Sequence, residues 1–120
     1  MIGWVDDDRR ALLTLPVQQG PKRQAWNVDA WVDTAFDGHF VFSMKLIEEL
    51  GLETLAETEA ILADGTKVVL ETFLAYLEWF GNVIPVQVVA NEGTFPLLGT
   101  ALLDGHRLMI DYRDRSLELS

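Results

Sequence analysis

The chain has 120 residues, 49% of them apolar, and a formal net charge of −10 that comes from 19 acidic and 9 basic residues. This length predicts one domain, residues 1–120, with a real core, and the acidic balance disfavours binding to a phosphate backbone, so we expect no nucleic-acid partner. The absence of cysteine excludes disulfides and thiolate zinc sites, and with only two histidines we expect no metal and no cofactor.

The chain opens with residues 1–10, which are polar after Val5. We expect this segment to be either a loose arm or a dimer-forming strand. It lacks the basic start, apolar stretch and small-residue cleavage site of a signal peptide. No apolar run in the chain approaches the roughly 18 residues that span a bilayer. We therefore expect a cytoplasmic protein without membrane contact.

The next two segments predict a β-hairpin. Residues 11–18 form a short apolar strand, and Gln19-Gly20-Pro21-Lys22 supplies a turn. The second strand, residues 26–32, alternates between two faces. One of these faces carries Trp26, Val28, Ala30 and Val32.

A strand fragment over residues 39–42 and then a helix are predicted next. Ser43 is a favourable N-cap, and Gly51 follows the last residue of the apolar stripe. That stripe consists of Met44, Leu46, Ile47 and Leu50. This is the one well-supported helix in the first three quarters of the chain.

A second hairpin is predicted around Asp64-Gly65, which joins residues 60–63 to a long strand from Thr66 to about Trp79. Asp-Gly between apolar strands is a strong short-range hairpin signal. A further strand follows over residues 83–90. Pro85 within it predicts an edge position or a bulge.

The last quarter of the chain predicts short elements only. Residues 95–99 read as an apolar strand that ends on glycine, and residues 100–103 as a short helical turn. Strands over residues 107–112 and 116–119 close the chain. Many short strands with turn signals between them, plus one helix, are typical of a small barrel or sandwich.

The candidate catalytic residue is Asp33, at the point where the strand 26–32 opens into a loop. Catalytic groups are often held on a loop that a rigid scaffold positions. The structural alternative is that Asp33 only turns the chain at the end of a strand, a position that Asp favours.

Three motifs, taken in order, resemble those of retropepsin-like aspartic proteases. Val32-Asp33-Thr34-Ala35-Phe36 resembles their Asp-Thr-Gly loop, and more closely the Asp-Thr-Gly-Phe loop of a cellular bacterial and archaeal branch. Leu62-Ala63-Asp64-Gly65-Thr66 falls where that family has its flap hairpin. Leu97-Leu98-Gly99 falls at its signature of two hydrophobic residues and a glycine. The resemblance covers nearly the whole chain.

This resemblance implies a mainly β fold, a small closed β-barrel with one or two short helices, and an aspartic endopeptidase that acts on peptides or proteins. Asp33 would be the catalytic acid/base, and Thr34 would hold two such loops together. A single Asp-Thr motif supplies half of the required carboxylate pair, so the resemblance implies a homodimer. The implied substrate-binding residues are Ala35, Asp37, Leu62, Ala63, Asp64 and Gly65.

Two departures from the family keep other functions open. Ala35 stands where the family has glycine, which tolerates closer approach of other groups. Thr100 stands where retroviral relatives have an arginine that pairs with the carboxylate corresponding to Asp37, and Arg107 is the alternative partner. One alternative function is an inactive domain of this fold that binds peptides or serves as a structural partner. Another is an unrelated small barrel that binds a hydrophobic ligand through Trp26, Trp31, Phe73 and Trp79.

Overall fold

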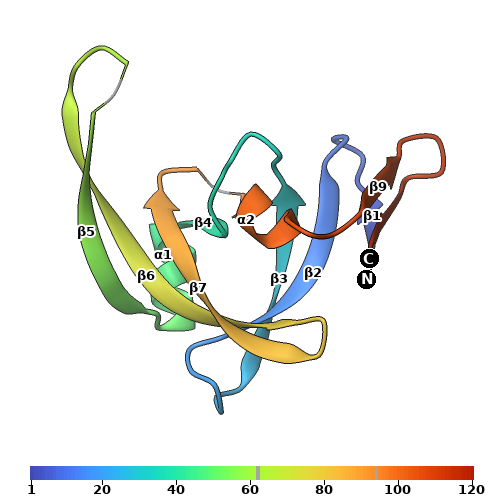
Figure 1. The fold of residues 1–120 in the computed structure, drawn as a ribbon, viewed down its shortest axis with the longest axis horizontal. Coiled ribbons are helices and arrows are strands. Elements are labelled where there is room, and N and C mark those ends of the chain that lie inside the picture. The colour runs from blue at the N-terminus through green and yellow to red at the C-terminus, as the bar shows by residue number, and fades with distance from the viewer. Residues whose placement is uncertain (62, 94) are drawn as a thin grey trace.

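The structure, a computed structural model, describes residues 1–61, 63–93 and 95–120 (Figure 1). Within these residues the chain is mainly β, with two short helices, α1 (Met44–Leu50) and α2 (Thr100–Leu103), so the expected fold class is confirmed. Neither helix is long and apolar enough to cross a membrane. The strands are β1 (Ile2–Val5), β2 (Ala11–Gln18), β3 (Ala25–Val32), β4 (Phe40–Ser43), β5 (Glu53–Ile61), β6 (Lys67–Trp79), β7 (Asn82–Asn91), β8 (Leu97–Leu98), β9 (Leu108–Asp111) and β10 (Ser116–Leu119).

All the strands belong to one sheet, whose order is β5-β6-β7-β4-β8-β3-β2-β1-β10-β9. An additional pairing joins β2 to β6, at Val17 opposite Leu77 and Gln18 opposite Tyr76. This pairing closes β6, β7, β4, β8, β3 and β2 into a ring, so the sheet curls around its own core. β5 and β9 remain as the two ends of the strand order.

The core is built from the inward faces of these strands, as the alternating patterns predict. On β3 the side chains of Val28, Ala30 and Val32 are buried, whereas Trp26 at the start of the strand is 54% exposed. On β6 the predicted face is buried in the second half of the strand, from Phe73 to Trp79. Its members are Phe73, Ala75, Leu77 and Trp79.

Helix α1 begins and ends where the sequence predicts. The Ser43 side chain accepts a hydrogen bond from the Leu46 N–H, which is a standard N-cap contact. Gly51 ends the helix in the left-handed region, with φ of 67°, a conformation that favours glycine. Ile47 and Leu50 bury the inner face of the helix.

The expectation of a loose arm over residues 1–10 is wrong. Ile2, Gly3 and Trp4 pair with β10, and Trp4 and Val5 pair with β2, so β1 lies inside the sheet. The sequence signal is weak because β1 has only four residues and is largely exposed. Whether residues 1–10 contact a second subunit remains a prediction.

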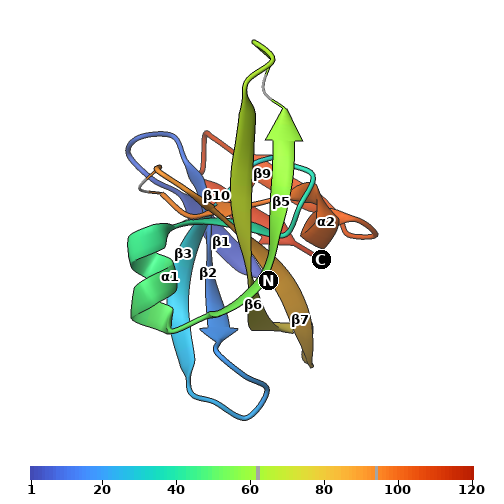
Figure 2. The same cartoon turned by 90° about the vertical axis from the view of Figure 1, so that its left-hand side faces the viewer.

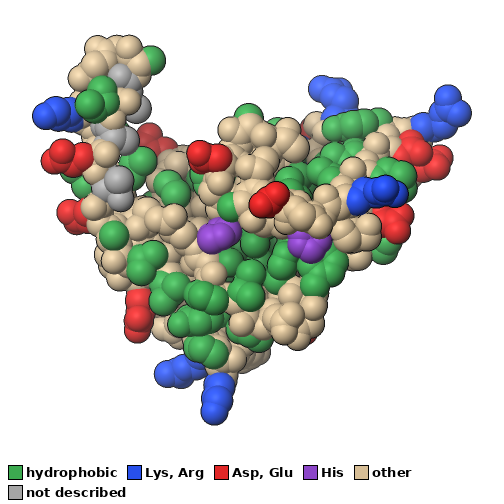
Figure 3. All heavy atoms as spheres, in the orientation of Figure 1, with side chains coloured by type: hydrophobic (Ala, Val, Ile, Leu, Met, Phe, Trp, Pro, Cys, Tyr) green, Lys and Arg blue, Asp and Glu red, His purple; other side chains and the backbone are tan. Residues whose placement is uncertain are grey.

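Strand β5 begins at Glu53, seven residues before the strand that the sequence predicts at 60–63. In the described part of the chain it pairs only with β6 and lies at one end of the sheet, so neither of its faces needs to be apolar. That removes the alternation on which strand prediction depends. The β5–β6 hairpin rises clear of the other strands (Figure 2). In the space-filling view it forms an arm that stands apart from the body (Figure 3).

The prediction for Pro85 is confirmed. β7 pairs with β6 along its length, but β4 contacts it only from Val88 to Asn91. Pro85 therefore lies where β7 has a single neighbour, and its missing N–H costs no ladder hydrogen bond.

Candidate active site

Asp33 follows the last residue of β3 and is held there by the backbone. Its N–H donates to the Leu98 carbonyl at 2.8 Å, and its own carbonyl accepts from the Phe36 N–H at 3.2 Å. The Ala35 N–H donates to the Asp33 Oδ1 at 2.9 Å, which orients the carboxylate. Among the described residues the other oxygen, Oδ2, has no hydrogen-bond partner. Asp33 is half-buried, whereas Thr34 and Ala35 are exposed.

The loop of residues 33–39, called the Asp33 loop below, rests on Gly99 and the start of α2. Backbone N–H groups of Gly99, Thr100 and Ala101 donate to loop carbonyls at 2.8, 2.8 and 3.2 Å. A Cβ on Gly99 would collide with the carbonyl oxygens of Gly38 and Phe36. The glycine of the Leu-Leu-Gly motif is therefore required by close packing against the loop.

Ala35 fits this loop without backbone strain. The non-glycine residues with positive φ in the described chain are Arg9, Phe80 and Arg115, so Ala35 is outside the left-handed region. The conformation that the loop adopts here does not demand glycine at this position. What the Ala35 methyl group can still affect is the space in front of the loop, because the residue is exposed.

A groove of about 350 Å³, called the Asp33 groove below, opens beside the carboxylate. Its lining combines the two predicted catalytic residues with apolar side chains from β3 and β8, which pair in parallel here. A carboxylate at the edge of a mostly apolar groove is a suitable place to bind and activate a small or extended ligand. The lining residues are Trp31, Val32, Asp33, Thr34 and Leu97.

One wall of this region is a stack that sequence reasoning missed. The Arg10 guanidinium carbon lies 4.1 Å from the centre of the Phe95 ring and 5.9 Å from that of Trp31. Phe95 also meets Trp31 edge to face, with 6.1 Å between ring centres. Arg10 is anchored from behind by Asp6 at 2.8 Å and Asp8 at 3.0 Å. No local sequence signal links these residues, because the contact joins three separate segments.

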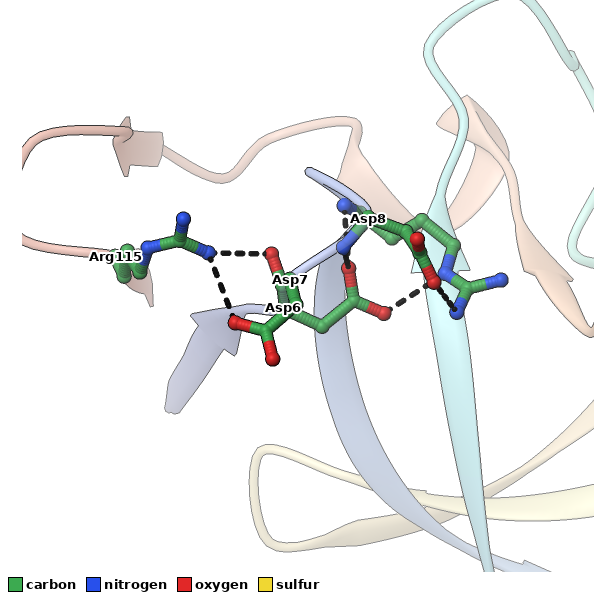
Figure 4. A network of polar contacts seen from close by, with 5 residues as sticks. Asp6, Asp7, Asp8 and Arg115 are labelled. Atoms are coloured by element: carbon green, nitrogen blue, oxygen red, sulfur yellow. Dashed lines mark hydrogen bonds and ion pairs between the residues drawn. The ribbon is translucent and has the colours of Figure 1, made fainter.

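The acidic turn that anchors Arg10 is itself braced by the far end of the chain (Figure 4). Arg115 donates to the Asp6 carbonyl at 2.7 Å and lies 3.6 Å from the Asp7 carboxylate. Burial acts to raise the pKa of Asp6, but hydrogen bonds and the charge of Arg10 outweigh it and lower that pKa below its usual range. Two arginines thus offset much of the charge of the Asp6-Asp7-Asp8 run.

Asp37 is placed near the Asp33 groove but not in it. It lines a separate hollow of about 420 Å³ together with Thr100, Ala101, Leu103 and Asp104. The suggested partner Arg107 is wrong for the described residues, where it forms no ion pair with Asp37. Instead, Thr100 anchors the backbone of the loop from which Asp37 projects.

The tip of the β5–β6 hairpin forms the expected Asp-Gly turn. The Asp64 Oδ1 accepts a hydrogen bond from the Thr66 N–H at 2.9 Å. Hydrogen bonding by the Thr66 side chain and by its backbone lowers the pKa of Asp64. Gly65 has a φ of 85°. Ala63, Asp64 and Gly65 are exposed, and they are not among the residues that line the Asp33 groove. Leu62, also predicted for this site, lies outside the described residues.

His39, the last residue of the Asp33 loop, makes a hydrogen bond that requires a neutral imidazole ring. Burial lowers the pKa of its imidazole, and its Nδ1 accepts a hydrogen bond from the Gln87 N–H at 3.0 Å. A proton on Nδ1 would remove this contact, so the neutral ring suits the end of the loop.

The aromatic side chains considered for a hydrophobic-ligand site lie in different surroundings. Phe73 and Trp79 are core residues, 3% and 8% exposed, whereas Trp26 lies 54% exposed at the surface. Trp31 lines the Asp33 groove rather than a separate cavity shared with the other three. This arrangement does not favour the hydrophobic-ligand alternative.

Comparisons with known proteins agree with the topology described above. No protein-family model matches the chain. An uncharacterized protein of Archaeoglobus fulgidus is 27% identical over 105 residues, which cover 81% of this chain and 80% of the relative. The structure is similar to EIAV protease complexed with an inhibitor, with a TM-score of 0.56 and 14% identity, over 82% of this chain and 88% of that one. It is also similar to the retroviral protease-like domain of Ddi1 from Leishmania major, with a TM-score of 0.52 and 18% identity, over 91% and 88% of the two chains. The chain therefore has the retropepsin-like fold.

Proposed function

We propose that the chain is an aspartic endopeptidase that acts as a homodimer, with one Asp33 from each subunit in the active site. The observation that carries this proposal is the position of Asp33. The chain has a retropepsin-like fold, and the loop that carries Asp33 is hydrogen-bonded to Gly99. The Asp33 side chain lines the Asp33 groove. A second copy would bring an identical carboxylate to the same place.

The chemistry follows from placing two carboxylates side by side. Like charges a few ångström apart cannot both ionise cheaply, so the pair shares one proton and titrates with two apparent pKa values that belong to the pair. The ionised member takes a proton from water as that water attacks the peptide carbonyl carbon. The protonated member donates its proton to the carbonyl oxygen. Collapse of the resulting diol, with a proton passed to the leaving nitrogen, breaks the peptide bond.

Other residues have supporting roles in this proposal. Thr34, exposed beside Asp33, would form hydrogen bonds to the matching loop of the second subunit. Ala35 and Asp37 would face the substrate backbone, and Leu62, Ala63, Asp64 and Gly65 would close over the bound peptide. The β5–β6 hairpin supports this last role because it stands apart from the body (Figure 3).

We also assign the chain to a cellular bacterial and archaeal branch of the retropepsin-like proteins. The archaeal relative supports this assignment, since the match extends over most of both chains. Phe36 supports it as well, because it agrees with the Asp-Thr-Gly-Phe loop of that branch.

The direct test is cleavage of a broad peptide library by the purified chain from acid to neutral pH. The wild-type protein should cleave peptides, most actively at mildly acidic pH, and Asp33→Asn should abolish cleavage while leaving the folded state intact by circular dichroism. Glu49→Gln makes the same carboxylate-to-amide change on the exposed face of α1 and should keep activity. Absence of cleavage by a wild-type dimer across that pH range would contradict the proposal.

A second function, an inactive domain that binds peptides or a protein partner, rests on Ala35. The Asp33 groove would serve binding equally well. This function predicts peptide binding by the wild-type chain without hydrolysis, which isothermal calorimetry combined with mass spectrometry of the recovered peptide distinguishes from cleavage.

A further inference from the structure

Strand β9 is an open edge of the sheet. Among the residues that the structure describes, it pairs only with β10, from Leu108 opposite Leu119 to Asp111 opposite Ser116, and it ends the strand order. β1 and β10 are each flanked by two strands of the same chain, so neither presents a free edge of this kind. An open edge exposes unpaired N–H and C=O groups to which a further strand can bind.

The hydrogen bonds of the β9–β10 hairpin identify which groups are free. Arg107 and Ser120 exchange both of their backbone hydrogen bonds, at 2.9 and 3.0 Å. In an antiparallel ladder such pairs alternate, so Met109 and Asp111 also direct their backbone groups to β10. Leu108 and Ile110 therefore direct their N–H and C=O groups to the open side.

The other free edge, β5, is protected against pairing with a copy of itself. It carries Glu53, Glu57 and Glu59, and its register with β6 shifts between Thr54 and Ala56. Repeated like charges and bulges are devices that prevent edge-to-edge association. β9, with the sequence Leu-Met-Ile-Asp, has neither device.

We propose that β9 pairs antiparallel with β9 of a second copy of this chain, about a two-fold axis at Met109. Leu108 and Ile110 of one copy would exchange hydrogen bonds with Ile110 and Leu108 of the other, four bonds in all, and the two Met109 residues would lie opposite each other. This proposal rests on the proposed function, since the carboxylate pair requires a second copy.

Charge complementarity supports this register. A two-fold axis at Met109 sets Arg107 opposite the partner's Asp111, and the reverse. Residues 107, 109 and 111 share one face of the strand. Within the described chain Arg107 is exposed and forms no ion pair. The Asp111 Oδ1 accepts from the N–H groups of Arg113 and Asp114, which leaves its Oδ2 for the partner's Arg107. Opposite charges directly across antiparallel strands stabilise the pairing.

The open edge is also connected to the Asp33 loop through a short segment of chain. α2, whose Thr100 binds the Asp33 loop, ends at Leu103, and β9 begins five residues later at Leu108. Figure 1 shows the segment after α2 running directly into β9. Four hydrogen bonds and two ion pairs make a small contact, so the loops around Asp33 must supply the remaining area of a stable dimer.

The native chain contains no cysteine, so single-cysteine variants report one contact each. Opposite residues that do not exchange hydrogen bonds have Cα atoms about 4.5 Å apart, within the range that a disulfide spans. Met109→Cys should therefore form a covalent dimer under mild oxidation, and urea should suppress it. Leu55→Cys, on the other free edge and equally exposed at 50% against 54% for Met109, is the matched control and should form far less.

Charge reversal tests the register. Arg107→Glu would place a negative charge opposite the partner's Asp111 twice per dimer and should raise the dimer dissociation constant at least about tenfold in sedimentation. Arg113→Glu makes the same change of net charge in the exposed hairpin turn and should have a much smaller effect.

The outcomes separate this proposal from the proposed function. Equal cross-linking of Met109→Cys and Leu55→Cys in a dimeric, active enzyme would overturn the β9 interface and leave the peptidase assignment standing. Selective cross-linking at Met109 in a chain that cleaves nothing would support the interface and count against the peptidase. A chain that remains monomeric at every concentration would overturn both.

Discussion

Thr100 holds the carbonyl oxygen of Phe36 through two groups, its backbone N–H at 2.8 Å and its hydroxyl at 3.2 Å. One carbonyl thus uses both lone pairs to join the Asp33 loop to the first residue of α2. Thr100 therefore acts on the backbone of the loop rather than on the Asp37 carboxylate.

Replacing Thr100 by valine should lower the free energy of unfolding by about 1 kcal/mol, because it removes the hydroxyl hydrogen bond at nearly constant volume. Thr100→Ser keeps the hydroxyl and serves as the control. Urea denaturation measures both. Equal stability of the valine and serine variants would mean that the backbone bond alone holds the loop.

Gly99→Ala should cost more, about 3 kcal/mol, because the new methyl group meets backbone carbonyl oxygens that cannot move aside without opening the loop. Gly20→Ala is the control. Its Cβ would meet only the flexible Arg23 side chain, at 3.3 Å, so its stability should change by less than about 1 kcal/mol. A Gly99→Ala protein as stable as Gly20→Ala would show that the clamp is not tight.

His39 should make stability depend on pH below about 6.5. Burial lowers its pKa in the folded state, so the unfolded chain binds a proton first and stability falls as the pH drops below the unfolded value. His39→Asn keeps an acceptor for the Gln87 N–H and should flatten the change in unfolding free energy between pH 7.5 and 5.5. His106→Asn leaves the contact between His39 and Gln87 in place and should retain the slope. An unchanged slope in His39→Asn would refute this origin.

Local sequence signals predict the elements that are determined by contacts between residues close in the sequence. Ser43 and Gly51 bound α1 because capping is a contact within a few residues. The buried face of β6 follows the alternation of its apolar side chains. Local signals predict only the end of β5 and do not place β1 in the sheet. Exposed strands need no apolar face, and the strands that pair with these two lie elsewhere in the sequence.

The candidate active site likewise has some features that the sequence predicts and others that depend on contacts between distant segments. Asp33 at the end of a strand and Leu97-Leu98-Gly99 could be picked out by pattern, but not the reason for the glycine, which is a contact with residues about 60 positions earlier. The stack of Arg10 on Phe95 joins segments 85 positions apart. The sequence shows alanine at position 35 in place of glycine. The backbone geometry shows that this alanine causes no backbone strain, so its methyl group can affect only the space in front of the loop.

Ala35→Gly separates the two proposed functions. Because Ala35 already has an ordinary backbone conformation, glycine gains no relief from strain and only adds freedom to the unfolded chain, which should lower stability by about 0.4–1 kcal/mol. Its N–H still reaches the Asp33 Oδ1, so the carboxylate should keep its orientation.

If the wild-type chain is a peptidase, the kcat of Ala35→Gly should stay within a few-fold of the wild-type value, and any change should fall mainly on KM, because the methyl group faces the substrate space. Cleavage that appears only in the glycine variant would instead show that the Ala35 methyl group blocks a site that is otherwise complete, and would favour the peptide-binding function. Comparing both variants at equal dimer concentration, set by sedimentation, keeps a difference in assembly from being read as a difference in chemistry.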